Sequence, residues 1–332
     1  MPRDYDEDEY YECTECNEGI EPEHVYRIAD SSAPYCSDCF DNMESALIHN
    51  YGYHPEPNFL YSDGHRSMYA PKHPTDPART ALAMGIEQEV EYVGNNGLKD
   101  GAEHVLKTIN QNGEVVYLKE DGSISWGFEI VSHPGTLEYF MNHFNWSGIE
   151  DLSRMDYESW NRRSCGLHIH MSRSAFKDEK HLFKFLVFIY KNPIELIQFA
   201  GRKSSYAKFD IDTFLNGTDS WGEPMKMRGS SFMKMAKRED SNDDRYCAVN
   251  LRNYQTVELR FFRPSLRSNT TKAALQFCDA AFNYTEMIKT PDVMSKNAIA
   301  FTEFRNWVGE QKDKYAILDA RIKERVKERE SV

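Results

Sequence analysis

Three segments far apart in the chain alternate between apolar and ionisable residues with a period of two, which is the period of a β-strand. The segments are Gly85-Ile-Glu-Gln-Glu-Val-Glu91, Cys165-Gly-Leu-His-Ile-His-Met171 and Thr256-Val-Glu-Leu-Arg-Phe-Phe262. Successive side chains of a strand point to opposite faces, so the ionisable residues of each segment share one face. They are Glu87, Glu89 and Glu91 in the first segment, His168 and His170 in the second, and Glu258 and Arg260 in the third. Clustered carboxylates repel one another unless cations neutralise them, so the pattern predicts a metal site built on a sheet.

A fourth segment, residues 123–130, shows the clearest alternation in the chain. Its apolar side consists of Ile124, Trp126, Phe128 and Ile130, and its other side of Ser123, Ser125, Gly127 and Glu129. The small residues around Glu129 would let a ligand approach the sheet. Asp121 has the parity of Glu129, although Asp121-Gly122 favours a turn that would interrupt the register. Each of these polar side chains taken alone could be an ordinary surface or buried residue; four segments with matching parity favour a shared site.

The remaining hydrophobic spacing predicts an α+β fold. It indicates strands over 84–93, 114–119 and 245–262, and helices over 100–110, 178–200, 270–289 and 311–330. Asn192-Pro193 is expected to divide the second of these helices, with Asn192 as an N-cap and Pro193 in the first turn of the new helix. Gly201 is expected to end it.

Composition divides the chain into four parts. Residues 1–49 hold an acidic tail and a cysteine module, 50–80 a linker, 81–310 the globular core, and 311–332 a charged C-terminal helix. The linker assignment depends on its five prolines, which oppose regular structure.

Four cysteines in two C-x-x-C pairs, Cys13 with Cys16 and Cys36 with Cys39, match the spacing of a structural zinc site. We expect a treble-clef or LIM-like module with a short helix over 41–49. Its filled coordination sphere would leave no position for catalysis, and the module could contact a protein partner. Free cysteines or two disulfides are the alternative, and His24 could replace one thiolate.

Charge and hydropathy exclude several classes of function. The 332 residues include 40% hydrophobic residues and carry a net charge of −13, which opposes general nucleic-acid binding. No apolar run is long enough to span a membrane. The first residues lack the apolar stretch of a signal peptide, so we expect a cytoplasmic protein whose cysteines bind metal more readily than they form disulfides.

The segment 201–270 departs from this acidic average, with 13 Lys and Arg against 9 Asp and Glu. Arginines are suited to bidentate contacts with phosphate or carboxylate oxygens. The candidates are Arg202, Lys203, Arg245, Arg252, Arg260 and Arg263, although any one of them could be a solvated surface charge. Acids for metal followed by arginines for anions would suit a metal-bound nucleotide and a carboxylate substrate.

The motifs together resemble those of the glutamine synthetase and glutamate–cysteine ligase superfamily, and most closely its amidoligase branch. The resemblance covers about residues 81–290. It rests on Gly85-Ile-Glu-Gln-Glu-Val-Glu91, Asp121-Gly-Ser123, Gly127-Phe-Glu-Ile-Val-Ser132, Cys165-Gly-Leu-His-Ile-His-Met-Ser172 and Val257-Glu-Leu-Arg-Phe261. It implies a curved antiparallel sheet of the glutamine synthetase type, with a polar concave face and helices on the convex side.

The resemblance implies an ATP-dependent carboxylate–amine ligase that works through an acyl phosphate. The family's residues correspond to Glu87, His168 and Glu258 for one Mg²⁺ or Mn²⁺ ion, and to Glu89 and Glu129, with Asp121, for a second. His170 would face substrate or nucleotide, and Arg260, with Arg245 or Arg202, would neutralise the phosphoryl group. The substrates would be a small-molecule or peptide carboxylate and an amine. The family's amine-binding loops have no clear counterpart in 202–247.

Two other functions remain open at this point. A metal-dependent hydrolase could use the same sheet with a metal-bound water and no nucleotide, but it would leave the arginine-rich segment unexplained. A zinc-tethered binding protein on an inactive ligase scaffold is the second, and the intact acids oppose it.

Overall fold

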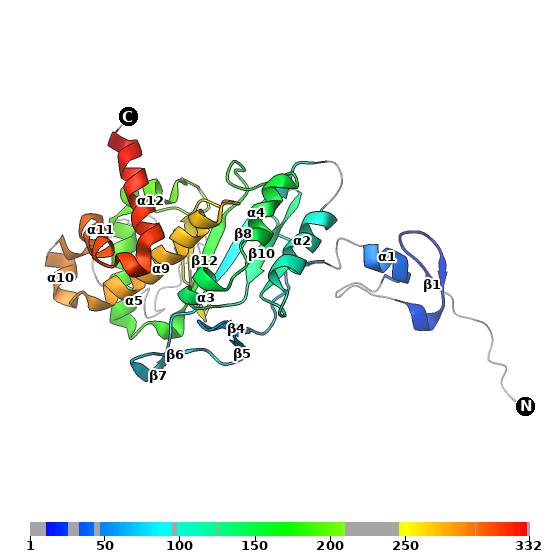
Figure 1. Ribbon diagram of the computed structural model, residues 1–332, viewed down its shortest axis with the longest axis horizontal. Coiled ribbons are helices and arrows are strands. Elements are labelled where there is room, and N and C mark those ends of the chain that lie inside the picture. Colours follow the sequence, from blue (N-terminus) through cyan, green and yellow to red (C-terminus); the bar gives the residue numbers. More distant parts are fainter. Residues whose placement is uncertain are drawn as a thin grey trace, which may run out of the picture.

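The computed structural model describes residues 11–25, 33–42, 47–94, 98–124, 126–209, 246–295 and 297–330 (Figure 1). Its main element is an eight-stranded sheet in the order β13-β14-β12-β8-β10-β9-β3, with β11 also paired to β8. The bounds of these strands are β3 Ile48–His49, β8 Met84–Tyr92, β9 Val116–Lys119, β10 Gly127–Ser132, β11 Tyr157–Glu158, β12 Leu167–Ser172, β13 Val249–Asn250 and β14 Thr256–Phe262. With the helices described below, this sheet confirms the α+β class.

The sheet is mixed, so the prediction of an antiparallel sheet is wrong at one edge. Strand β3 pairs with β9 in parallel, whereas the other strand pairs are antiparallel. Residues 48 and 49 form this strand where the sequence predicts part of a helix, and α1 instead covers Ser37–Asn42. The backbone N–H of Glu120 donates to the carbonyl of His49 at 2.8 Å, which extends the pairing. The short strand covers backbone groups of β9 that an open edge would leave unpaired.

The two faces of the sheet differ as the strand parity predicts. On one face, Ile86 and Val90 of β8 are fully buried in the core, and Figure 1 shows α9 (Ser268–Met287) running alongside β12. Gln88 shares this buried face. Its Nε2 donates to the Ser265 carbonyl at 2.8 Å and its Oε1 accepts from the Thr271 hydroxyl at 3.2 Å. Both ends of the amide therefore have partners, as a buried polar group requires.

Two helices occupy the stretch predicted over 178–200. Asp178 caps α5 (Glu179–Lys191) by accepting from the His181 N–H at 2.8 Å, and α6 runs over Pro193–Ala200. Gly201 ends α6 with a φ of 69°, a conformation that favours glycine. Asn192 does not cap α6 with its side chain; its Nδ2 donates to the Phe188 and Ile299 carbonyls at 2.7 and 2.8 Å. It therefore ties α5 to the chain just before α11 (Phe301–Glu310).

Two predicted strands begin later than expected, because turns precede them. The Asp121 side chain accepts from the Ser123 N–H at 2.7 Å, and the Ile124 N–H donates to the Asp121 carbonyl at 3.1 Å. This turn delays β10 to Gly127 and leaves Trp126 53% exposed. The strand predicted over 245–262 is divided into β13 and β14, since the Asn253 side chain accepts from the Gln255 N–H at 2.9 Å in a turn between them.

Residues 50–80 contain regular structure that the proline content did not predict. Four short strands lie there: β4 Phe59–Leu60, β5 Arg66–Ser67, β6 Lys72–His73 and β7 Asp76–Thr80. Leu60 is fully buried in the main core. Its N–H donates to the Pro134 carbonyl at 2.9 Å, and its carbonyl accepts from the Thr136 N–H at 3.0 Å. This segment is therefore attached to the end of the sheet.

Further helices complete the core. They are α2 Lys99–Ile109, α3 Leu137–Asn142, α4 Ser147–Glu150, α10 Thr290–Ser295, α11 Phe301–Glu310 and α12 Lys312–Glu330, with 3-10 turns η3 Asp151–Arg154, η4 Arg173–Ala175 and η5 Asn297–Ile299. Helix α12 buries Tyr315, Leu318 and Ile322 in the same core as the sheet. In the described part of the chain, no helix combines the length and the apolarity that crossing a bilayer requires.

The N-terminal residues form a unit with a small core of its own. Strands β1 (Tyr11–Glu12) and β2 (Gly19–Ile20) make a hairpin, and η1 covers Pro22–His24. Cys13, Ile20 and Tyr35 are buried together, apart from the main core. The first C-x-x-C pair lies in the hairpin, and the second pair lies at the start of α1.

His181 of α5 makes the stability of the fold depend on pH. Its ring packs against those of Phe176 and Phe282, which also contact each other. Its Nε2 lies 2.9 Å from the Phe282 carbonyl, and its Nδ1 accepts from the Lys177 N–H at 3.3 Å. Only the neutral ring with its proton on Nε2 satisfies both partners. Burial accordingly lowers the pKa of His181 from 6.5 to about 4.

Because the unfolded chain takes up this proton near pH 6.5, the stabilisation by neutral His181 is complete above that pH and is lost as the pH falls toward 4. We expect a loss of up to roughly 3 kcal/mol in the free energy of unfolding. Urea unfolding at a series of pH values would measure it. His181→Gln should flatten the pH dependence in this window, and an unchanged slope would contradict the assignment.

Candidate functional site

The register of the central strands brings the predicted acids and histidines together on the polar face. In β8, Glu87 lies opposite His168 of β12, and Glu89 lies opposite Glu129 of β10. In β14, Glu258 lies opposite His170 of β12. Side chains opposite each other in a sheet are about 4.5–5.5 Å apart at Cβ, so four strands deliver their polar groups to one place.

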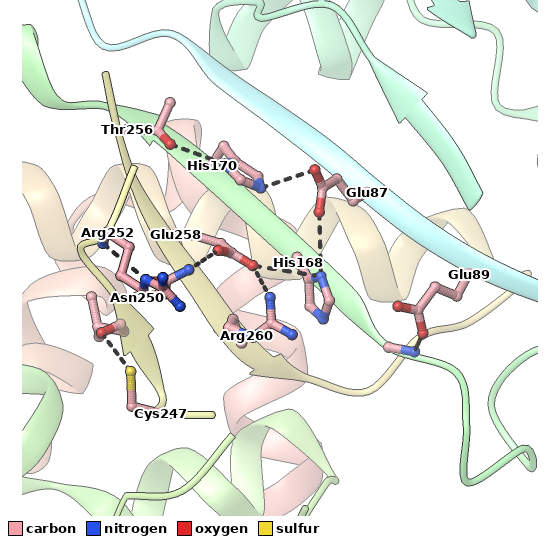
Figure 2. Close-up of polar contacts among 12 residues, drawn as sticks. Glu87, Glu89, His168, His170, Cys247, Asn250, Arg252, Thr256, Glu258 and Arg260 are labelled. Carbon is pink, nitrogen blue, oxygen red and sulfur yellow. Dashed lines mark hydrogen bonds and ion pairs between the residues drawn. The ribbon is translucent and has the colours of Figure 1, made fainter. Parts of the chain in front are cut away.

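Two groups of potential metal ligands result. The first donor set is Glu87, His168 and Glu258, and the second donor set is Glu89, Glu129 and His168; within each set the ligand atoms lie within 4.8 Å of one another. His168 Nδ1 is 3.4 Å from Glu87 Oε2 and 3.6 Å from Glu258 Oε1. Figure 2 shows the carboxylates of Glu87 and Glu258 pointing toward the same nitrogen of this ring. His168 thus links the two sets.

Gly166 of the second motif is needed for this packing. A Cβ on Gly166 would lie 2.7 Å from Arg202 Nη1 and 2.9 Å from His168 Nε2, so a side chain there would displace these two groups. Its backbone N–H donates to Glu89 Oε2, which fixes that carboxylate. Asn250 Nδ2 donates to Glu258 Oε2 at 2.6 Å and fixes another. Sequence reasoning did not assign a role to either residue, although Gly166 lies inside a quoted motif.

Lys119 is a further member of the site that the sequence did not reveal. It pairs with Glu129 in the register of β9 and β10, and it is 5% exposed. Its Nζ lies 3.1 Å from Glu129 Oε2 and 3.9 Å from Glu87 Oε1. The ammonium group therefore lies near Glu87 of the first donor set and Glu129 of the second donor set. The sequence does predict that Lys119 ends a strand. Its partner Glu129 follows only from the order of the strands in the sheet.

The acids of the site differ in their affinity for protons. Burial opposes ionisation of Glu87, but His170 and His168 outweigh burial and hold the pKa of this carboxyl well below its ordinary value. Burial raises the pKa of Glu129 well above the ordinary value, and repulsion by Glu87 adds to it against the attraction of Lys119. Burial also raises the pKa of Glu89. Glu89 and Glu129 therefore resist ionisation in the absence of a cation. A cation bound beside them would favour their charged forms.

The predicted anion-binding residues are distributed unevenly. His170 Nε2 lies 3.2 Å from Glu87 Oε1, and Arg260 pairs with Glu258 through Nη1 (Figure 2). Arg202 Nη1 donates to the carbonyls of Arg260 and Phe262 at 3.4 and 3.3 Å. These three residues border the donor sets. Asp121 belongs to neither set and instead forms the turn before β10, and Arg245 lies outside the described residues.

The composition of both sets fits a hard divalent cation. Carboxylate oxygens dominate, and magnesium and manganese prefer such ligands, with one imidazole more readily tolerated by manganese. Glu91, the third acid of the motif, belongs to neither set, and its Oε2 lies 3.4 Å from Arg162 Nε.

The four cysteines also form a potential metal site. Their sulfur atoms lie within 4.8 Å of one another, and Cys16 and Cys36 are 3.7 Å apart. A tetrahedral zinc site with Zn–S bonds of about 2.3 Å places its sulfurs roughly 3.8 Å apart, so the spacing fits zinc. The Cys39 N–H donates to Cys36 Sγ at 3.4 Å. Such bonds favour the thiolate form that metal binding requires.

The chain matches no protein-family model and no curated protein. Among solved structures it is similar to a bifunctional glutathione synthetase from Pasteurella multocida, with 12% sequence identity and a TM-score of 0.38. The match covers 74% of this chain and 46% of the other, so the chain spans less than half of that relative. The likeness is too distant to carry a functional argument, and the function has to be inferred from the site.

Proposed function

We propose that this protein is an ATP-dependent carboxylate–amine ligase, an amidoligase with a glutamine-synthetase-like sheet. The observation that carries the proposal is the meeting of Glu87, Glu89, Glu129, His168 and Glu258 from four strands in two adjoining donor sets. With the exception of Asp121, which lies in neither set, these are the residues that the motif resemblance assigns to two metal ions, and their convergence did not have to follow from the motifs. Scattered acids would have removed the basis of the proposal.

The reaction would proceed in two displacements. An oxygen of the substrate carboxylate attacks the γ-phosphorus of ATP, the bond from that phosphorus to the bridging oxygen breaks, and ADP leaves. The amine nitrogen then attacks the acyl carbon and loses a proton, and phosphate departs as the amide forms. Enzymes promote phosphoryl transfer mainly by positioning and by neutralising charge.

The residues of the site can be given roles in this scheme. The first donor set would hold one magnesium or manganese ion and the second donor set, through its carboxylates, another; when bound, the ions would neutralise phosphate oxygens. Arg260 and Arg202 lie beside these sets and would take up charge on the transferred phosphoryl group. Lys119 favours the charged form of Glu129, against the burial that opposes its ionisation. His170, held by Thr256 Oγ1 at 3.0 Å from its Nδ1, would face the substrate.

The test uses hydroxylamine as the amine, because it captures acyl phosphates as hydroxamates. Purified protein is incubated with ATP, Mg²⁺ or Mn²⁺, hydroxylamine and a panel of carboxylates, and ADP and hydroxamate are both quantified. Equal amounts of the two products, dependent on the divalent ion, would support the ligase. Hydrolysis of substrates without ATP cleavage would favour a metal-dependent hydrolase, and neither activity would favour a binding protein.

The four-cysteine unit belongs to the same proposal as a zinc-binding module that stabilises the N-terminal part and offers a surface to a protein partner. We expect the purified protein to contain one zinc ion per chain and Cys36→Ser to lose most of it, because a tetrahedral site with three thiolates binds more weakly. Elemental analysis measures the zinc. Hydroxamate formation should stay near the wild-type rate; its loss in a folded variant would contradict the structural role. Cys278→Ser, a buried cysteine outside the cluster, is the matched control.

A further inference from the structure

A cavity of about 860 Å³ adjoins one end of the site. Its floor is the polar face of the sheet, where Gly85, Glu87, His170 and Thr256 contribute side chains or backbone from three neighbouring strands. Glu87 belongs to the first donor set and His170 contacts it, so the cavity opens directly onto the proposed cation site. The cavity is within the range of pockets that enclose small ligands, about 300–1,000 Å³.

The walls of the cavity are mostly apolar and come from parts of the chain that the motifs do not include. Pro55 and Pro57 contribute from the segment before β4, Phe59 from β4 itself, Tyr117 from β9, and Tyr254 from the turn before β14. Flat proline and aromatic rings suit a bulky apolar group, and Tyr and Phe supply much of the binding energy in such pockets. Charged residues at the rim include both Arg173 and Glu179, so the rim does not favour one sign of charge.

The segment that forms the proline wall is held in place. The Asn58 N–H donates to His133 Nδ1 at 3.2 Å, and His133 is buried, with its Nε2 3.0 Å from Glu114 Oε1. Leu60 then pairs with the backbone around Gly135. Because the wall is anchored on both sides of Phe59, the cavity exists without a bound ligand, and binding there would not require the segment to be ordered first.

We infer that this cavity binds the body of the carboxylate substrate, and that this body is bulky and largely apolar. The inference rests on the proposed ligase function, because a carboxylate must reach the end of the cavity at Glu87 and His170 to meet the phosphoryl group. A small acid such as acetate would leave most of the cavity filled with water, whereas an aryl or branched acid would displace that water and contact the walls.

Gly85 gives a direct way to test the inference. It has the parity of Glu87, so a side chain there would project from the floor into the cavity. An added Cβ would lie 3.4 Å from the nearest atom, the Ser132 carbonyl oxygen, which is ordinary contact. Gly85→Val should therefore fold and shorten the cavity, with Gly85→Ala as the milder change. Gly309→Ala, in α11 with 4.0 Å to the nearest atom, is the matched control.

The probes are 3-phenylpropanoate and acetate. Ligand-observed NMR with Mg²⁺ and without ATP reports binding, and hydroxamate formation with ATP and hydroxylamine reports turnover. We expect 3-phenylpropanoate to bind wild type and to have the higher kcat/KM. Gly85→Val should lower its kcat/KM relative to acetate by at least roughly tenfold, the effect of a few methyl groups in a fitted pocket. Gly309→Ala should change neither binding nor turnover.

The outcomes separate this inference from the proposed function. Binding of 3-phenylpropanoate that Gly85→Val abolishes supports the cavity assignment, even if no acid supports ATP cleavage; that second result would overturn the ligase. Equal kcat/KM values for both acids, unaffected by Gly85→Val, would overturn the cavity assignment while leaving the ligase intact. The cavity assignment would also be overturned if Gly85→Val lowered kcat/KM for bulky amines and not for bulky acids.

Discussion

Glu87→Gln should reduce ATP-dependent hydroxamate formation by on the order of 10²–10³-fold or more, the effect of removing one electrostatic contributor from a phosphoryl-transfer site. Glu87 occupies the centre of the site. Its carboxylate reaches His168 at 3.4 Å, His170 at 3.2 Å and Lys119 at 3.9 Å. Glutamine keeps the size and removes the charge, so the loss should come from weaker cation binding and not from a cavity.

Because the pKa of Glu87 is low, Glu87→Gln removes a negative charge that the wild-type protein carries at neutral pH. The carboxyl is ionised throughout the neutral range, because the two imidazoles overcome the effect of burial. The wild-type protein therefore presents a fixed negative charge to the cation, and the variant has none. The measurement is the rate of hydroxamate formation over a range of Mg²⁺ concentrations. A lower affinity for Mg²⁺ together with a lower maximal rate is the expected result.

The matched control is Glu91→Gln, on the same strand and with the same parity. Glu91 belongs to neither donor set and contacts Arg162. We expect its rate to remain within a few-fold of wild type. Thermal unfolding of both variants establishes that they fold. A folded Glu87→Gln protein with normal activity, or an equal loss in Glu91→Gln, would contradict the assignment of the first donor set.

The sequence predicted which side chains share a face, because the alternation of a strand is a local property of the chain. This is why Glu87, Glu89, His168, Glu258 and Glu129 could be named as one group before their arrangement was known. Which strands are neighbours is a long-range property, and parity along a single strand does not contain it. The motif resemblance supplied that information for the core strands only.

Three features of the structure therefore remained hidden. Lys119 enters because β9 lies beside β10, and that order places it opposite Glu129. The prolines of residues 50–80 predicted a linker without regular elements, whereas the structure has four short strands there, and proline content does not say which surface a segment covers. The parallel strand at Ile48–His49 is two residues long, too short for any periodic signal.

Lys119 and the expected cations both neutralise the acids of the site, so the effect of replacing Lys119 should be large and should depend on whether cations are bound. The ammonium group is buried beside Glu129 and close to Glu87, and these two acids increase its pKa above the ordinary value although burial opposes this. Removing one partner of a buried ion pair leaves the other charge uncompensated, which typically costs 3–5 kcal/mol. In the absence of divalent ions, and at a pH high enough to ionise Glu129, we therefore expect Lys119→Met to lower the free energy of unfolding by roughly that amount.

Mg²⁺ or Mn²⁺ should restore much of this loss, because a cation bound only to the folded protein stabilises it in proportion to the logarithm of its concentration. Urea unfolding with EDTA and with added Mg²⁺ would measure both effects in wild type and variant. Lys107→Met is the matched control, since Lys107 is a 77% exposed lysine whose side chain contacts Glu103 at 2.9 Å. An exposed pair of this kind contributes about 0.3–0.5 kcal/mol. If Lys119→Met is destabilised and divalent ions do not relieve it, the acids do not bind cations, and the charge balance proposed for the site is wrong.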